Sequence, residues 1–281
     1  MKPERYPAQN FFIANVLDAS PKSDIASLEH PIFALAKQPD TASRQYERRG
    51  VFVRVTPSAD GMATIWDKDV LIYCVSQIRE AMNRGREVGP IIEFHPHDLF
   101  RHTNKPINGN SYRWLRQALS RLRGMTIETN VRTGGVETFD TFGLIDKAHY
   151  ERRDPSDRNS KLDYVSVTLS DWQYRAVEHR EVLTIDRDYF RLQGALERRL
   201  YEVGRKHCGK QRRWAVGIEC LHEKSGSRAA LKSFRYAVRA LVRDDPLPGY
   251  ALEYIDDKDQ LGFTNRKAGA AMAARALRVT G

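Results

Sequence analysis

The sequence predicts an α+β fold with two tandem winged-helix domains related by a pseudo-repeat. Three observations support this prediction. Residues 110–124 have the apolar spacing of a helix with one basic face. Strand-like runs at residues 125–130 and 136–145 follow this helix, with a turn at residues 133–135 between them. The same order of elements recurs downstream, and a basic helix followed by a two-stranded hairpin is the layout of a winged helix.

Alternation and turn residues predict the elements that come before this helix. Residues 25–37 form a short helix or turn next to an extended piece, because a proline stands near their middle. Residues 46–56 alternate and are β-branched, which favours a strand that pairs with residues 62–66 across a turn. We also expect a helix at residues 68–82 with Asp67 as its N-cap, a strand at residues 91–94 and a short helix at residues 96–102.

The helix at residues 110–124 has one apolar and one basic face. Its apolar face consists of Tyr112, Leu115, Leu119 and Leu122. The basic residues have no acidic partner at i+4, so ion pairs along the helix do not explain them. Arg and Gln are residue types that read guanine and adenine edges, and a basic residue near the hairpin tip suits a wing that touches the DNA backbone. We therefore predict DNA contacts in this half from Asn110, Ser111, Arg113, Arg116, Gln117, Ser120, Arg121 and Arg132.

The second half repeats the basic helix at residues 228–243. Arg116 and Arg235 stand 119 positions apart. At the same offset the apolar face recurs as Leu231, Phe234, Val238 and Leu241. A hairpin with strands at residues 250–255 and 261–264 should follow, and its acidic turn should stay away from phosphate. The DNA contacts predicted in this half come from Lys210, Arg212, Arg213, Ser227, Arg228, Lys232, Arg235, Tyr236 and Arg239.

The repeat divides the chain into two domains. The charged, proline-containing segment at residues 148–161 is the expected linker, and an alternating strand at residues 162–169 is expected to start the second half. A helix from about residue 188 to residue 207, a strand at residues 214–218 and a short helix at residues 219–224 should then lead to the second basic helix. We assign an N-terminal arm to residues 1–24, the first winged helix to residues 25–152, the second to residues 153–265 and a basic, Ala-rich tail to residues 266–281.

The composition favours a folded protein with an anionic partner. The 281 residues are 41% hydrophobic and carry a formal net charge of +10, which suggests nucleic acid or a membrane surface. No apolar run approaches the roughly 18 residues of a membrane span, and nothing at the N-terminus resembles a signal peptide. Three cysteines, Cys74, Cys208 and Cys220, are far apart. We therefore expect reduced thiols in a cytoplasmic protein that binds no membrane.

No pattern of residues predicts catalysis. His95 and His97 flank a proline, whereas replication nickases carry two histidines around a bulky apolar residue, so these side chains fit better as polar residues at a helix start. The histidines and cysteines at residues 207–222 lack the CxxC spacing of a zinc site. Phosphate-binding glycine loops and the GxSxG and HExxH motifs are absent. We expect no catalytic residue, no metal and no cofactor.

Four segments resemble the bacterial plasmid replication initiator protein A family. They are HPIFALAKQPDT at residues 30–41, RQYERRG at residues 44–50, ATIWDKDVLIYCVSQI at residues 63–78 and NSYRWLRQALSRLRGMTIETN at residues 110–130. The resemblance implies a plasmid-borne initiator that binds repeated duplex DNA sequences at an origin and recruits host replication proteins, with the host initiator and helicase as partners. More distantly, the chain is similar to the tandem winged-helix initiators of iteron plasmids. In those, the C-terminal winged helix mainly reads bases and the N-terminal one contacts backbone and mediates dimerisation, which implies a homodimer through the first domain.

The predicted function is therefore sequence-specific binding of origin DNA without catalysis. Two alternatives fit parts of the sequence. A winged-helix transcriptional repressor would have the same fold, and initiators often repress their own promoters. An origin-nicking enzyme is disfavoured by the missing histidine motif, and metal-dependent cleavage of origin DNA would distinguish it from both binding functions.

Overall fold

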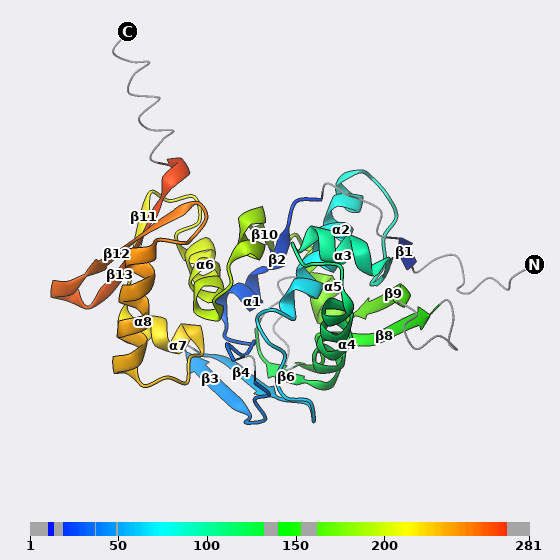
Figure 1. Cartoon of the computed structure of the whole chain (residues 1–281), viewed down its shortest axis with the longest axis horizontal. Coiled ribbons are helices and arrows are strands. Elements are labelled where there is room, and N and C mark those ends of the chain that lie inside the picture. Colours follow the sequence, from blue (N-terminus) through cyan, green and yellow to red (C-terminus); the bar gives the residue numbers. More distant parts are fainter. Residues whose placement is uncertain are drawn as a thin grey trace, which may run out of the picture. The chain divides into compact units, whose positions relative to one another are not determined.

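The structure of the chain is a computed structural model (Figure 1). It describes residues 11–13, 19–36, 38–48, 50–131, 140–152 and 162–268. The chain forms two compact units: unit 1 consists of Met1–Ile25 and Ala36–Thr184, and unit 2 consists of Ala26–Leu35 and Ile185–Gly281. None of the helices in the described ranges is long and apolar enough to cross a membrane.

Unit 1 combines helices with two four-stranded sheets and a two-stranded pair. Its helices are α2 (Lys68–Asn83), α3 (Pro96–His102), α4 (Gly109–Gly124) and α5 (Asp171–Glu178), and α1 (Ile25–Glu29) crosses from unit 1 to unit 2 along the sequence. One sheet has the strand order β1 (Phe11–Ile13), β5 (Ile91–Phe94), β9 (Leu162–Leu169), β8 (Ile145–Arg152). The other has the order β3 (Arg44–Arg48), β4 (Val51–Thr56), β6 (Thr126–Thr129), β7 (Asp140–Phe142), and the pair joins β2 (Lys22–Asp24) to β10 (Val182–Thr184). Helix α2 is buried along most of its length and forms the centre of the unit.

Unit 2 is a smaller arrangement of helices around a three-stranded sheet. Its helices are α6 (Ala195–His207), α7 (Ile218–Ser225) and α8 (Leu231–Asp244), with the short 3-10 helices η1 (Arg187–Arg191) and η2 (Asp256–Lys258). The sheet has the order β11 (Arg213–Gly217), β13 (Gln260–Asn265), β12 (Tyr250–Ile255), and both pairings are antiparallel. Buried Arg199 on α6 donates to the carbonyl oxygens of Leu28 and Glu29 at 3.0 and 2.9 Å, so residues from the N-terminal part of the chain are part of this unit.

The two units share one order of elements. In unit 1 it is α2, β5, α3, α4, β8, β9, and in unit 2 it is α6, β11, α7, α8, β12, β13. The sheet orders also correspond, because β5-β9-β8 and β11-β13-β12 both place the last strand in the middle with antiparallel neighbours. The topology therefore contains an internal repeat, in which β6 and β7 of unit 1 have no counterpart in unit 2 and β8 and β9 replace the hairpin predicted after α4.

The hairpin that follows α4 differs from the predicted wing. Strand β6 pairs with β7, as expected, but also with β4, and the run predicted as one strand at residues 136–145 supplies β7 and only the first residue of β8. The break falls at Gly143, where an added β-carbon would lie 3.1 Å from the Ile145 carbonyl oxygen and 3.3 Å from that of Arg123. The strands that correspond to β12 and β13 are β8 and β9.

The division of the chain also differs from the expectation. The segment at residues 153–161, inside the expected linker, lies outside the described residues, and the strands on either side of it pair with each other as β8 and β9. Strand β9, expected to start the second half, also pairs with β5 in unit 1. Unit 2 resumes at Ile185 instead. The charged segment predicted as a linker therefore stands between two paired strands of unit 1, and not between the two units.

Several element boundaries shift from the prediction. The strand expected at residues 46–56 is the hairpin of β3 and β4, with Gly50 at a φ of +77° in its turn. Residues 62–66 form no strand, and the long helix expected from about residue 188 is divided into η1 and α6. Gly194 is the N-cap residue of α6, and its N–H donates to the Glu197 side chain at 2.9 Å.

The core faces of the two basic helices are confirmed. On α4 the four predicted apolar residues are all buried. On α8, Phe234 and Val238 are buried, whereas Leu231 and Leu241 are half-buried. The helix starts at Leu231, three residues later than predicted. The periodicity therefore identified which side of each helix faces solvent.

Candidate nucleic-acid interface

Helix α4 presents an exposed polar face formed by Arg113, Arg116, Gln117 and Ser120. The Arg113 guanidinium donates to the side-chain oxygen of exposed Asn110 at 3.4 Å, and the Ser120 hydroxyl donates to Asp60 at 2.5 Å. Within the part of the chain that the structure describes, the side chains of Arg116 and Gln117 have no hydrogen-bond partner. This face can therefore approach a large anionic ligand without first breaking an ion pair.

Two predicted contact residues on α4 have structural roles instead. The Ser111 side chain is buried, and its hydroxyl donates to the Pro106 carbonyl oxygen at 2.5 Å at the start of the helix. Arg121 donates from Nε and Nη2 to the two carboxylate oxygens of Asp67 at 2.8 and 2.9 Å. The Arg121 side chain is 15% exposed and Asp67 is fully buried, so this pair belongs to the interior. Hydrogen bonding to Asp67 raises the pKa of Arg121 above its ordinary value.

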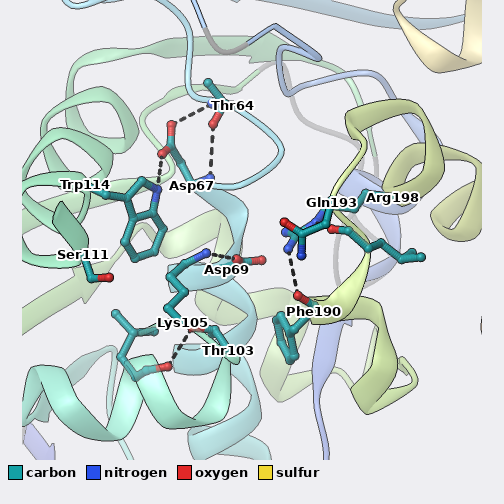
Figure 2. Close-up of polar contacts among 12 residues, drawn as sticks. Thr64, Asp67, Asp69, Thr103, Lys105, Ser111, Trp114, Phe190, Gln193 and Arg198 are labelled. Atoms are coloured by element: carbon teal, nitrogen blue, oxygen red, sulfur yellow. Dashed lines mark hydrogen bonds and ion pairs between the residues drawn. The ribbon is translucent and has the colours of Figure 1, made fainter. Parts of the chain in front are cut away.

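Asp67 anchors α4 to the start of α2. Its carboxylate accepts hydrogen bonds from the Trp114 indole at 3.1 Å and from the Thr64 backbone N–H at 2.8 Å (Figure 2). Asp67 is the N-cap residue of α2, as predicted, but its side chain makes no capping hydrogen bond to that helix. Nearby, the Lys105 ammonium pairs with Asp69 at 2.7 Å and lies 4.2 Å from the centre of the Trp114 ring. This cluster fixes the orientation of α4 and leaves its opposite face to solvent.

Helix α8 presents the second exposed face, formed by Lys232, Arg235, Tyr236 and Arg239. The Tyr236 side chain is 71% exposed, an unusual position for a large aromatic residue. Lys232 is exposed and has no side-chain partner within the described residues. Cationic and aromatic groups on one exposed helix face suit a polyanion with flat bases.

The acidic turn of the β12–β13 hairpin packs against this face. Arg235 donates from Nε and Nη2 to one Asp259 oxygen at 3.0 and 2.7 Å, and Arg239 pairs with Asp256 at 2.6 Å. The Arg239 guanidinium also lies 3.8 Å from the centre of the Tyr254 ring, and the Tyr254 hydroxyl donates to Asp259. The hydrogen bond from Arg235 lowers the pKa of Asp259, and the same bond raises the pKa of Arg235. The acidic turn, whose charge should keep it away from phosphate, contacts two of the arginines predicted to bind DNA.

The remaining predicted residues are not brought together by one element. Lys210 and Arg212 are exposed in the turn after α6, and Arg213 begins β11, where it pairs with Glu253. Ser227 and Arg228 precede α8, and the Ser227 hydroxyl accepts from the Ala229 N–H at 3.3 Å. Arg132 lies outside the described residues.

The histidines and cysteines considered as metal ligands are distributed over several elements. The His95 side chain accepts from the His97 backbone N–H at 3.2 Å, which makes it the N-cap of α3, as a polar residue at a helix start should be. Among the described residues, no group of three or more His, Cys, Asp or Glu side chains could hold a metal ion. Cys74, Cys208 and Cys220 are free thiols, and burial raises the pKa of Cys74 to about 12.

Comparisons with known proteins are consistent with a DNA-replication function. The family model described as replication initiator protein A matches residues 22–252. A "putative replication protein" of Wigglesworthia glossinidia brevipalpis is 37% identical over 261 residues, which cover 92% of this chain and 94% of that protein. A crystal structure of domains 2 and 3 of RctB is similar with a TM-score of 0.64 and 12% identity, covering 86% of this chain and 98% of that chain. A second structure of the same RctB domains has a TM-score of 0.59 and 11% identity, covering 89% and 99%. At this identity the two structures show a shared fold.

Proposed function

The chain belongs to the replication initiator protein A family, and we propose that it initiates plasmid replication by binding repeated duplex DNA at an origin without catalysing a reaction. Host replication proteins, including the host initiator and helicase, would then be recruited to the bound DNA. Strand opening would follow from DNA bending and this recruitment, because the sequence contains no phosphate-binding loop for a nucleotide.

We further propose that each unit contains a winged helix. The first would consist of α2, β5, α3, α4, β8 and β9, and the second of α6, β11, α7, α8, β12 and β13. The shared element order and the shared sheet order support this assignment. It places the basic helix third among the helices of each unit, which is the position of the recognition helix in a helix-turn-helix protein with a wing. Dimerisation through the first predicted domain, residues 25–152, remains a prediction from the family resemblance.

One observation carries the DNA-binding proposal: α4 and α8 present equivalent exposed faces of cationic and hydrogen-bonding side chains over buried apolar faces. We propose that α8 reads bases with Lys232, Arg235, Tyr236 and Arg239. We propose that α4 enters a second major groove with Arg113, Arg116 and Gln117. Lys210, Arg212 and Arg228 are exposed cations that could bind phosphates.

Selection from a library of random duplexes tests this function without knowledge of the origin. The purified chain should enrich one motif at about 150 mM salt. Two recognition helices in successive major grooves would give a motif of roughly two helical turns, with centres about 10–10.5 base pairs apart. A palindromic motif protected with two-fold symmetry would favour a dimeric repressor. Enrichment of no motif would contradict sequence-specific binding, and metal-dependent cleavage of the selected duplex would contradict a non-catalytic role.

A further inference from the structure

We propose that Asp256 and Asp259 in the turn of the β12–β13 hairpin are positioning residues that hold Arg235 and Arg239 in the orientation needed to read bases. This inference rests on the proposed function, because it takes α8 as the base-reading helix. It assigns the acidic turn a role in DNA specificity, although its charge has the wrong sign for binding phosphate.

The geometry of the turn matches the spacing of the two arginines. Arg235 and Arg239 are separated by four residues and therefore lie on one side of α8, one turn apart. The two acids lie at the two ends of η2, and Asp259 has a φ of +46°. Arg235 pairs with Asp259, and Arg239 pairs with Asp256. Two separate ion pairs thus fix the turn to the helix at both ends.

Arg235 retains the donors that base recognition requires. A guanidinium has five N–H donors. Asp259 binds the edge that carries Nε and Nη2, at 3.0 and 2.7 Å. The edge formed by Nη1 and Nη2 has only the exposed Glu219 carboxylate near it, 4.0 Å from Nη2, and it can donate two parallel bonds to O6 and N7 of a guanine. An acid bound in this way restricts the rotation of the side chain without occupying its bidentate end.

Tyr254 connects the two ion pairs. Its hydroxyl donates to Asp259, and the centre of its ring lies 3.8 Å from the guanidinium carbon of Arg239. The Arg235 and Arg239 side chains nevertheless stay 35% and 46% exposed. Exposed ion pairs contribute little to folding stability. Their main effect should therefore be on where the two guanidinium groups point, and their removal should leave the fold intact.

Positioning and simple charge neutralisation predict different binding data. If the acids only repel phosphate, their removal should tighten binding to every duplex by a similar factor. If they position the arginines, their removal lets both side chains move to nearby phosphates. Binding to the selected duplex should then weaken while binding to a scrambled duplex stays equal or tightens.

The turn itself supplies a matched control. Asp257 is exposed in the same turn, and its side chain has no partner among the described residues. Asp257→Asn therefore removes one negative charge at nearly the same place, as Asp256→Asn alone does, without releasing an arginine. Asparagine also tolerates positive φ, so Asp259→Asn should preserve the turn.

The experiment compares dissociation constants of the full-length chain for the selected and the scrambled duplex at one salt concentration. We expect the Asp256→Asn/Asp259→Asn variant to lose about tenfold or more of the wild-type specificity ratio. Asp257→Asn should leave that ratio unchanged. Circular dichroism of each variant checks the fold. The single variant Asp256→Asn releases Arg239 and leaves Asp259, the residue with positive φ, unchanged, so it tests the positioning role without risk to the turn.

The outcomes separate this inference from the function beneath it. Equal tightening on both duplexes in the double variant, or a specificity ratio equal to that of the wild type, would overturn the positioning role. A wild-type chain that prefers no duplex would instead contradict the proposed function before any variant is compared.

Discussion

The exposed faces of α4 and α8 have the same residue spacing but different electrostatic surroundings. On α4, Arg113 and Arg116 have no acidic partner within the described residues, and the arginine that does have one, Arg121, is turned into the interior. On α8, both central arginines pair with acids of a neighbouring turn while remaining partly exposed. The exposed arginines of a basic helix can therefore be without an ion pair in the described part of the chain, as on α4, or held by ion pairs, as on α8. Which of the two occurs depends on acidic residues that lie outside the helix.

The largest expected effect separates Arg121 from the other arginines of α4. Arg121→Ala leaves the fully buried Asp67 carboxylate without its bidentate partner, so we expect unfolding to become easier by about 3–5 kcal/mol. Arg113→Ala, on the exposed face of the same helix, should change the free energy of unfolding by less than about 0.5 kcal/mol. Urea denaturation followed by circular dichroism measures both. Similar stability of the two variants would mean that Arg121 is solvated.

This contrast shows what the sequence could and could not predict about the site. Periodicity identified the buried and exposed sides of α4 and α8, because one face of each helix packs against the core and the opposite face is in water. It could not place Arg121, which lies at the edge of the buried face, because its partner Asp67 stands 54 residues earlier in the chain. It also could not show that Asp259, in the turn of the predicted wing, would bind Arg235.

The fold was predictable to a similar extent. The order of helices and strands in unit 2 follows from local patterns, and each end of β12 and β13 was predicted to within one residue. The unit 1 hairpin that corresponds to β12 and β13 was predicted at the wrong place, because two further strands, β6 and β7, stand between α4 and β8. Strand pairing over such separations depends on sheet partners such as β4 and β5, which a local pattern does not reveal.

The next effect compares the buried faces of the two helices. Leu119→Ala should cost about 2–5 kcal/mol of unfolding free energy, because this side chain is 2% exposed and its removal leaves a cavity. Val238→Ala should cost less, since a valine loses fewer atoms, although Val238 is fully buried. Thermal denaturation of both variants, with Ser120→Ala as the exposed control on α4, tests the comparison. An unchanged melting temperature for either core variant would place that residue on the surface.

Binding measurements should distinguish the two exposed faces. Arg235→Ala removes a base-reading side chain, so we expect a loss of about 1–3 kcal/mol on the selected duplex and relaxed preference at one base pair. Arg116→Ala, at the corresponding position of α4, should weaken binding to selected and scrambled duplexes more evenly. Parallel titrations of both variants on both duplexes measure this. An equal loss on both duplexes for Arg235→Ala would make that residue a phosphate contact only.

Acidification should weaken unit 2 through the half-buried side chain of His30. Burial lowers the pKa of His30 to about 4, below its unfolded value of about 6.5. Because the unfolded chain binds the extra proton between these values, stability is complete above pH about 6.5 and falls as the pH is lowered towards 4. We expect a loss of roughly 1–2 kcal/mol between pH 7 and pH 5 from this group. His30→Gln should flatten the pH profile of the unfolding free energy, and an unchanged profile would mean that His30 is solvated.

The smallest effect concerns the salt dependence of DNA binding. If about six basic groups of the two units contact phosphates, the log–log slope of affinity against salt should be near −5, at about −0.9 per phosphate. Arg116 has no acidic partner among the described residues, so Arg116→Gln should make the slope shallower by about 0.9 if this residue binds a phosphate. Arg239 is already paired with Asp256, and a base contact releases no phosphate counterion, so Arg239→Gln should change the slope by much less. Equal changes in slope would show that α4 and α8 use their arginines alike, and a wild-type slope shallower than about −2 would mean that the two faces do not bind DNA together.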